Sequence, residues 1–208
     1  MQDIRNKSGF TLVELLVALM VMSIVLAAVA TLSFAMGSAN DAGDDTSQKQ
    51  AQVRYATLRL CDLIKNCRLI CAAADNDLAI WRSDDNDDGQ IDPSELVYLE
   101  AGQDRNYLQL LDFPSAFSWP VLLSSIQSGT AKEELKLVFE ERQTTLLAEC
   151  SNVEFRLDSA VPQSKFVSIL FDVAENEIGH QYQINAAVRG WAGHLLNAYG
   201  DSIVGDDD

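Results

Sequence analysis

The sequence predicts an α+β protein in which one long N-terminal helix, apolar in its first part, precedes a strand-rich head. Residues 15–36 contain no charged residue and no proline, as expected of a helix in an apolar environment. From residue 77 onward, apolar residues come in short runs that often alternate with polar ones, a pattern typical of half-buried antiparallel strands. A chain of 208 residues can form one compact domain plus one further long element.

Composition narrows the classes of function. The chain has 31 acidic and 15 basic residues and a formal net charge of -16, whereas a nucleic-acid-binding protein normally presents a cationic face. The two histidines and the lack of a nucleophile or phosphate-loop motif argue against an enzyme. We therefore expect no bound nucleic acid and no catalytic residues.

The N-terminal segment has the features of a membrane span. The 22 residues from Leu15 to Met36 would extend about 33 Å as a helix, the thickness of a hydrocarbon core. Because Arg5 and Lys7 precede this run, the N-terminus is expected in the cytoplasm and the remainder outside it. A cleavable signal peptide, cut near residues 28–30 or 37–39, is the alternative. The length of the run and the acidic Glu14 at its cytoplasmic end argue against that alternative.

Residues 7–16, Lys-Ser-Gly-Phe-Thr-Leu-Val-Glu-Leu-Leu, resemble the processing motif of type IV prepilins. The resemblance implies that a prepilin peptidase cleaves between Gly9 and Phe10 and that the new amine of Phe10 is methylated. Glu14 then becomes the fifth mature residue. Its carboxylate would set the axial register by pairing with the Phe10 amine of a neighbouring subunit.

The resemblance also implies a pilin-like fold, with the long helix packed on an antiparallel sheet, and a place in a filament. The expected protein is a minor pilin of a type IV pilus or a pseudopilin of a type II secretion system, anchored once in the inner membrane beside other such subunits. Family members often have proline where this chain has Thr31, so a less kinked helix is expected. The expected layout is leader 1–9, membrane helix 10–36, hinge 37–50, amphipathic helix 51–73, head 74–194 and acidic tail 195–208.

Two segments connect the membrane helix to the head. Residues 37–45 are polar and contain two glycines, which should weaken a helix and create a hinge or a frayed segment. Beyond them, apolar residues at steps of three and four predict an amphipathic helix. Its apolar stripe consists of Val53, Ala56, Leu60, Leu63, Ile64, Cys67, Ile70 and Cys71.

The head is expected to contain short strands. Between them, residues 119–123, Trp-Pro-Val-Leu-Leu, should form a short helix or a packed loop. The expected strands are residues 78–82, 96–100, 107–111, 135–140, 153–157, 166–173 and 182–188.

The four cysteines would lie where disulfides can form. The apolar stripe places Cys67 and Cys71 inward and Cys61 nearer the polar face, so Cys67 or Cys71 is the better candidate to pair with Cys150. The alternative is that these cysteines are small buried hydrophobes. Their spacing does not fit a zinc site well.

Residues 84–95, Asp-Asp-Asn-Asp-Asp-Gly-Gln-Ile-Asp-Pro-Ser-Glu, match the twelve-residue EF-hand calcium loop. Gly89 stands where that loop turns sharply, and Ile91 is its apolar anchor. The flanks read as strands, so a structural Ca²⁺ that clamps a hairpin is expected rather than a switch, and a solvated acidic turn is the alternative. The expected ligands are Asp84, Asn86 and Asp88 through side chains, Gln90 through its carbonyl, Asp92 through water, and Glu95 with both oxygens.

A calcium-binding interaction module, either secreted or membrane-anchored, is the alternative function.

Overall fold

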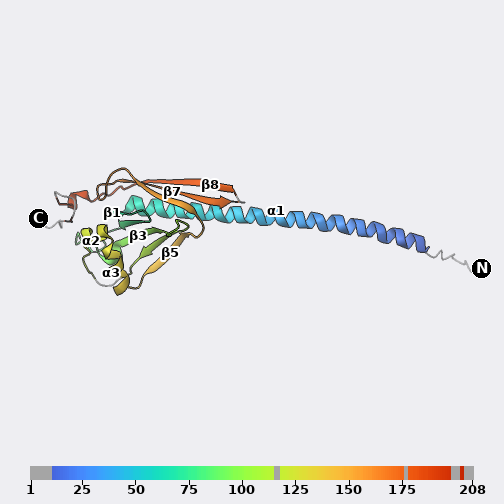
Figure 1. Ribbon diagram of the computed structural model, residues 1–208, viewed down its shortest axis with the longest axis horizontal. Coiled ribbons are helices and arrows are strands. Elements are labelled where there is room, and N and C mark those ends of the chain that lie inside the picture. Colours follow the sequence, from blue (N-terminus) through green and yellow to red (C-terminus); the bar gives the residue numbers. More distant parts are fainter. Residues whose placement is uncertain (1–10, 115–117, 176–177, 198–201, 204–208) are drawn as a thin grey trace, which may run out of the picture. The chain divides into compact units, whose positions relative to one another are not determined.

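The computed structural model describes residues 11–114, 118–175, 178–197 and 202–203 (Figure 1). The chain divides into two compact units, Met1–Ser47 and Gln48–Asp208. Helix α1, Leu12–Asn66, contributes to both. A long, initially apolar helix followed by antiparallel sheets confirms the expected α+β, pilin-like layout.

From Leu12 onward the first unit is entirely helical. Helix α1 is continuous through residues 37–50, so the expected fraying is wrong. A glycine inside a helix costs about 1 kcal/mol, and Gly37 and Gly43 lie within a helix of 55 residues whose flanks favour helix on both sides. A hinge that bends without loss of helix stays a prediction.

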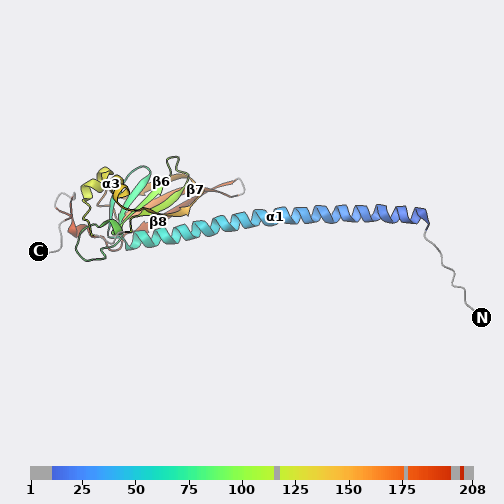
Figure 2. The same ribbon diagram turned by 90° about the horizontal axis from the view of Figure 1, so that it is seen from below.

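The second unit contains two antiparallel sheets (Figures 1 and 2). Each strand pairs with the next along the chain within its sheet, as in a meander. The five-stranded sheet consists of β1 Leu69–Ala73, β2 Asp77–Trp81, β3 Leu96–Ala101, β4 Leu108–Asp112 and β5 Arg142–Leu147. The three-stranded sheet consists of β6 Ser151–Leu157, β7 Phe166–Glu175 and β8 Ile178–Ala187. The short helices are α2 Leu123–Ser128, α3 Thr130–Val138, and the 3-10 turns Pro93–Glu95 and Gly193–Leu195.

Each face of the five-stranded sheet packs against a hydrophobic core, although most of β5 is exposed. Strand β2 shows the alternation: Leu78 and Ile80 belong to one cluster, which includes the inner face of α1 and residues of both sheets. Ala79 and Trp81 belong to a second cluster with residues of α2 and α3. Because successive side chains of a strand point to opposite faces, the sheet has one core on each side.

Helix α1 ends at Asn66, so the helix expected over residues 51–73 is wrong in its last turns. Residues 69–73 form β1, with Ile70 opposite Ile80 of β2. Ile70 packs in the first cluster and Cys71 in the second, the opposite-face placement of a strand. Ile70 and Cys71 lie three and four residues after Cys67, a spacing that also fits the apolar stripe of a helix.

The strand expected over residues 135–140 is also wrong, because α3 occupies most of it. Leu135, Leu137 and Phe139 lie two residues apart, as on one face of a strand, but Val138 between them is also apolar, and the buried pair in α3 is Ala131 and Leu135, four residues apart. The other expected strands are confirmed, with ends shifted by a few residues, and β1 and β5 were not expected. In the segment expected as a short helix or loop, α2 begins only at Leu123.

Candidate functional site

The apolar part of α1 is long enough to cross a membrane. Leu12–Ser38 comprises 27 residues, all exposed, and contains an 18-residue stretch of mean hydropathy 2.8. At 1.5 Å per residue this segment extends about 40 Å, more than a hydrocarbon core. A helix that is apolar on all sides requires lipid or other helices around it.

Glu14 closes the first turn of α1. The Thr11 backbone N–H and hydroxyl donate to Glu14 Oε2 at 3.2 and 3.1 Å, and the Glu14 N–H donates to Thr11 Oγ1 at 3.2 Å. These reciprocal bonds are a capping box, which satisfies N–H groups that the first turn leaves unpaired. The spacing Thr-x-x-Glu in the sequence could have revealed this role. Gly9 and Phe10, the predicted cleavage site, lie outside the described residues.

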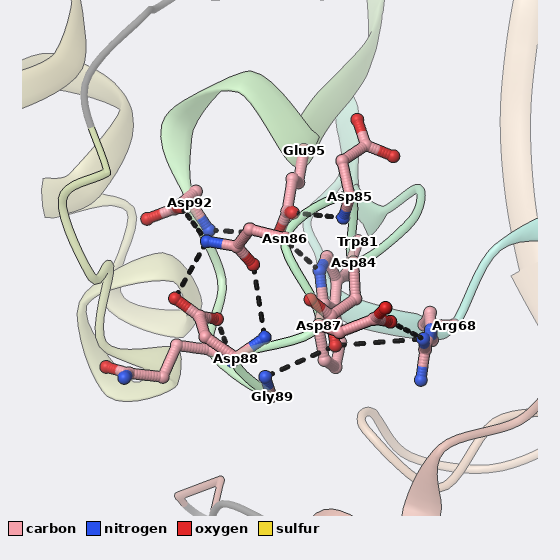
Figure 3. A network of polar contacts seen from close by, with 11 residues as sticks. Arg68, Trp81, Asp84, Asp85, Asn86, Asp87, Asp88, Gly89, Asp92 and Glu95 are labelled. Carbon is pink, nitrogen blue, oxygen red and sulfur yellow. Dashed lines mark hydrogen bonds and ion pairs between the residues drawn. The ribbon is translucent and has the colours of Figure 1, made fainter.

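The acidic loop connects β2 to β3, and its first half is held by backbone amides (Figure 3). The Gly89 N–H donates to Asp84 Oδ2 at 3.2 Å, and the Asp88 N–H to Asn86 Oδ1 at 3.2 Å. The Gln90 N–H donates to Asp88 Oδ1 at 2.8 Å. Gly89 has φ +70°, a conformation that favours glycine and explains this residue at the sharp turn.

The second half of the loop buries two carboxylates, Asp92 and Glu95. Glu95 Oε1 accepts the Asp85 N–H at 2.6 Å, and Oε2 accepts the Trp81 indole N–H at 3.1 Å and the Asp92 N–H at 3.3 Å. Burial raises the pKa of Glu95, and these hydrogen bonds partly offset that effect. The carboxylate of Glu95 therefore points at the loop backbone.

Asp92 connects the loop to a distant segment of the chain. Its carboxylate accepts the Ser118 hydroxyl at 2.8 Å and the Trp119 N–H at 2.9 Å. The Asn86 amide also donates to Asp92, at 3.0 Å, and to Asp88, at 2.8 Å. Asp92, the ninth residue of the loop, thus holds Ser118 and Trp119 in the segment that follows β4.

Asp84 carries a polar atom without a partner. Its side chain is 4% exposed, and Oδ1 is buried without a hydrogen bond in the described structure. Because Oδ2 accepts the Gly89 N–H, the carboxylate lies within the loop. The nearest cation is Arg68, whose Nη2 lies 3.7 Å from Asp84 Oδ2 and 4.0 Å from the Asp87 carboxylate. A buried carboxylate oxygen without a donor is costly, which favours a cation at this position.

Hydrogen bonds join five of the six predicted ligands: Asn86 contacts Asp88 and Asp92, the Gln90 N–H contacts Asp88, and the Asp92 N–H contacts Glu95, whereas Asp84 binds the backbone of Gly89. Across the described ranges, however, no three acidic, histidine or cysteine side chains converge closely enough to hold a metal ion. Gly89 has the positive φ expected at the sharp turn, while the ligand side chains accept amide protons.

All four cysteines lie in described residues and are free thiols, so none of the expected disulfides is present. Cys67 packs in the first core cluster and Cys71 in the second, on opposite sides of the sheet. Burial raises the pKa of Cys67 to about 12 and that of Cys150 to about 11. Cys67 and Cys71 therefore match the alternative of small buried hydrophobes.

A largely buried ion cluster at the end of β2 and β3 away from the acidic loop was not anticipated from the sequence. Lys132 Nζ of α3 lies 2.5 Å from Asp77 Oδ2 and 2.7 Å from Glu100 Oε1. Burial alone would raise the pKa of Glu100, but hydrogen bonds from Lys132 and Gln109 lower it below its usual value. The cluster connects α3 to both strands that flank the loop.

Comparison with known families concerns the N-terminal segment. The family described as the prokaryotic N-terminal methylation motif matches residues 4–30. The chain therefore carries the prepilin-type motif. In this prepilin-like chain the matched region includes Glu14 and most of the apolar part of α1. No curated protein and no solved structure matched the chain.

Proposed function

We propose that this chain is a structural subunit, a minor pilin or pseudopilin, of a type IV pilus or type II secretion filament. The observation that carries the proposal is the prepilin-type motif at the start of a 27-residue apolar helix that the chain itself leaves exposed. Before assembly the inner membrane would cover this helix, and afterwards the helices of other subunits would.

Processing defines how the subunit would enter the filament. Cleavage between Gly9 and Phe10 by prepilin peptidase would leave the apolar helix in the mature protein. Methylated Phe10 would then present its cationic amine to Glu14 of a neighbour. The capping box holds the Glu14 carboxylate at the first turn of α1, beside the mature N-terminus. A carboxylate at this depth needs such a cation.

Mass spectrometry of the mature N-terminus tests this function. We expect a peptide that begins at methylated Phe10 in membranes of cells with prepilin peptidase and not in membranes of cells without it. A mature terminus near Asn40 would instead show a secreted soluble protein. That result would refute the filament proposal and favour a calcium-binding interaction module.

We also propose that residues 84–95 bind Ca²⁺ and stabilise the head. The supporting observation is the partnerless Oδ1 of buried Asp84, within a loop that has glycine at the sharp turn. Hard oxygen ligands are the type that Ca²⁺ prefers. The proposed ligands are Asp84, Asn86, Asp88, the Gln90 carbonyl, Asp92 through water, and Glu95.

The ion would act as a structural clamp. Strands β2 and β3 flank the loop in place of the helix pair that opens in a calcium sensor. The loop concentrates carboxylates whose mutual repulsion is now countered by Arg68 and by Arg82, the latter 3.5 Å from Asp85. A divalent cation would remove that repulsion and tighten the connection between the strands.

Isothermal titration of the full chain in detergent with CaCl₂ tests the site. We expect saturable binding that Asp88→Ala abolishes, because this exposed side chain is a proposed ligand whose loss does not open the core. Asp87→Asn is the matched control, since Asp87 is 92% exposed and is not a proposed ligand. No heat of binding at millimolar calcium would refute the site.

A further inference from the structure

The outer face of α1 in the second unit carries an exposed basic surface. Arg54, Tyr55, Leu58 and Arg59, here called the basic face, adjoin one another at helical spacings of one, three and four. Tyr55 is 53% exposed and Leu58 66% exposed, although both are large and apolar. Within the described ranges neither arginine forms an ion pair.

A second exposed surface on α3 has the opposite charge. Glu133, Glu134, Leu137 and Val138, here called the acidic face, adjoin one another at the same helical spacings. Leu137 is 88% exposed and Val138 57% exposed. In the described part of the chain, Glu133 and Glu134 form no ion pair, whereas Lys132 and Lys136 on the same helix do.

The two faces complement each other in charge, and both are partly apolar. Each combines two exposed apolar side chains with two like charges. Beside the basic face lies an open hollow of about 380 Å³, lined by Val53, Leu58 and Tyr182 among others. Leu137, the most exposed of the large apolar residues, projects from the acidic face and could fill such a hollow. Apolar contact would provide affinity, and the charges at its rim would fix the orientation.

The charge of the whole chain makes this local match significant. Two copies that each carry a net charge of -16 repel each other unless a basic surface is at the contact. Residues 48–66 of α1 provide one, with four basic residues against the single acidic Asp62. The chain therefore contains both halves of a favourable contact within an otherwise repulsive surface.

We propose that the acidic face of one copy docks on the basic face of a second copy. This inference rests on the proposed filament function and names the partner as the chain itself. Because the two faces differ, each docked copy leaves one face open for the next, and the contact repeats from head to tail. Such heterologous contacts generate open helical assemblies. The pairs Arg54 and Arg59 with Glu133 and Glu134 would set the direction.

Photo-crosslinking from position 55 tests the contact. The full chain with benzoylphenylalanine in place of Tyr55, an exposed aromatic replacement, is expressed with prepilin peptidase and irradiated in membranes. We expect a product with the mass of two copies, in which the peptide joined to position 55 includes residues from 133–138. Charge reversal by R54E and R59E should lower its yield about tenfold or more, because like charges then face each other. Adding E133R and E134R to the same chain should restore it.

A dimer joined through other residues, a crosslink to a different protein or no crosslink would each overturn the inference. So would a yield that charge reversal leaves unchanged. Unchanged thermal unfolding of the reversed variants shows that they fold. The same samples report the N-terminus: processed Phe10 without the dimer refutes only this contact, whereas an unprocessed terminus refutes the proposed function.

Discussion

Replacing Lys132 with methionine removes the cation that lies between Asp77 and Glu100. The three side chains are 17%, 27% and 11% exposed, so the two carboxylates would face each other with little water between them. Breaking a buried ion pair costs about 3–5 kcal/mol, and the partial exposure here reduces the expected loss to about 2–4 kcal/mol. Methionine retains most of the apolar stem of Lys132, which limits the change to the charge.

The sign of the pH dependence follows from the pKa shifts. The pKa of Glu100 is lowered in the folded protein, so its contribution to stability is complete at pH 7 and is lost as the pH falls through that lowered value. The pKa of Lys132 is raised, and its contribution is therefore also complete at pH 7. The difference between wild type and Lys132→Met should be largest near neutral pH and should shrink below the ordinary glutamate value of 4.5.

Urea unfolding of the full chain in detergent measures this effect through tryptophan fluorescence, since Trp81, Trp119 and Trp191 all lie in the second unit. Lys136→Met is the matched control on the same helix: its partner Glu141 is 3.7 Å away and both are about one-third exposed. We expect less than about 1 kcal/mol from that exposed pair. Equal losses in the two variants, or a loss from Lys132→Met that is the same at pH 7 and pH 3, would refute the reasoning.

Three further predictions follow from the sites. Calcium at about 100 times its dissociation constant should stabilise the head by about 2.7 kcal/mol in thermal unfolding, and Asp88→Ala, unlike Asp87→Asn, should remove that gain. Glu14→Ala should leave the chain in the membrane on carbonate extraction but reduce its amount in sheared filaments, and normal filament incorporation would contradict the role of Glu14. Without reductant, Ellman's reagent should titrate four thiols in denatured chain but few in native chain, because burial raises the pKa of Cys67 and Cys150; fewer than four after denaturation would show a disulfide.

The sequence predicts those elements whose local pattern agrees with their tertiary setting. The apolar start of α1 and strands such as β3 and β7 are examples. Residues 135–140 show the limit, because a short run with apolar Leu135, Leu137 and Phe139 predicts a strand, whereas packing buries Ala131 and Leu135 on one side of a helix. Only the packing of this segment against the rest of the head decides between the periodicity of a strand and that of a helix.

The same limit applies to the acidic loop. Its motif locates the loop, the glycine at the turn and the buried Glu95, all within twelve residues. It does not reveal Arg68, Trp81 or Ser118, which hold the loop from other parts of the chain. Of these three residues, Trp81 could best have been predicted from the sequence. It lies three residues before Asp84, and a buried indole N–H needs an acceptor.

These outside contacts bear on what calcium would do. Asp92 and Glu95 already accept hydrogen bonds from Ser118, Trp119, Trp81 and backbone amides of the loop, so these buried carboxylates are satisfied without an ion. Asp84 Oδ1 is the exception. A loop that is mostly satisfied keeps its backbone path when the ion leaves, and binding energy appears as stability instead of as folding of the hairpin. Calcium should therefore raise the unfolding temperature of the head while its far-ultraviolet circular dichroism stays unchanged, and a gain of strand signal on calcium addition would show folding coupled to binding instead.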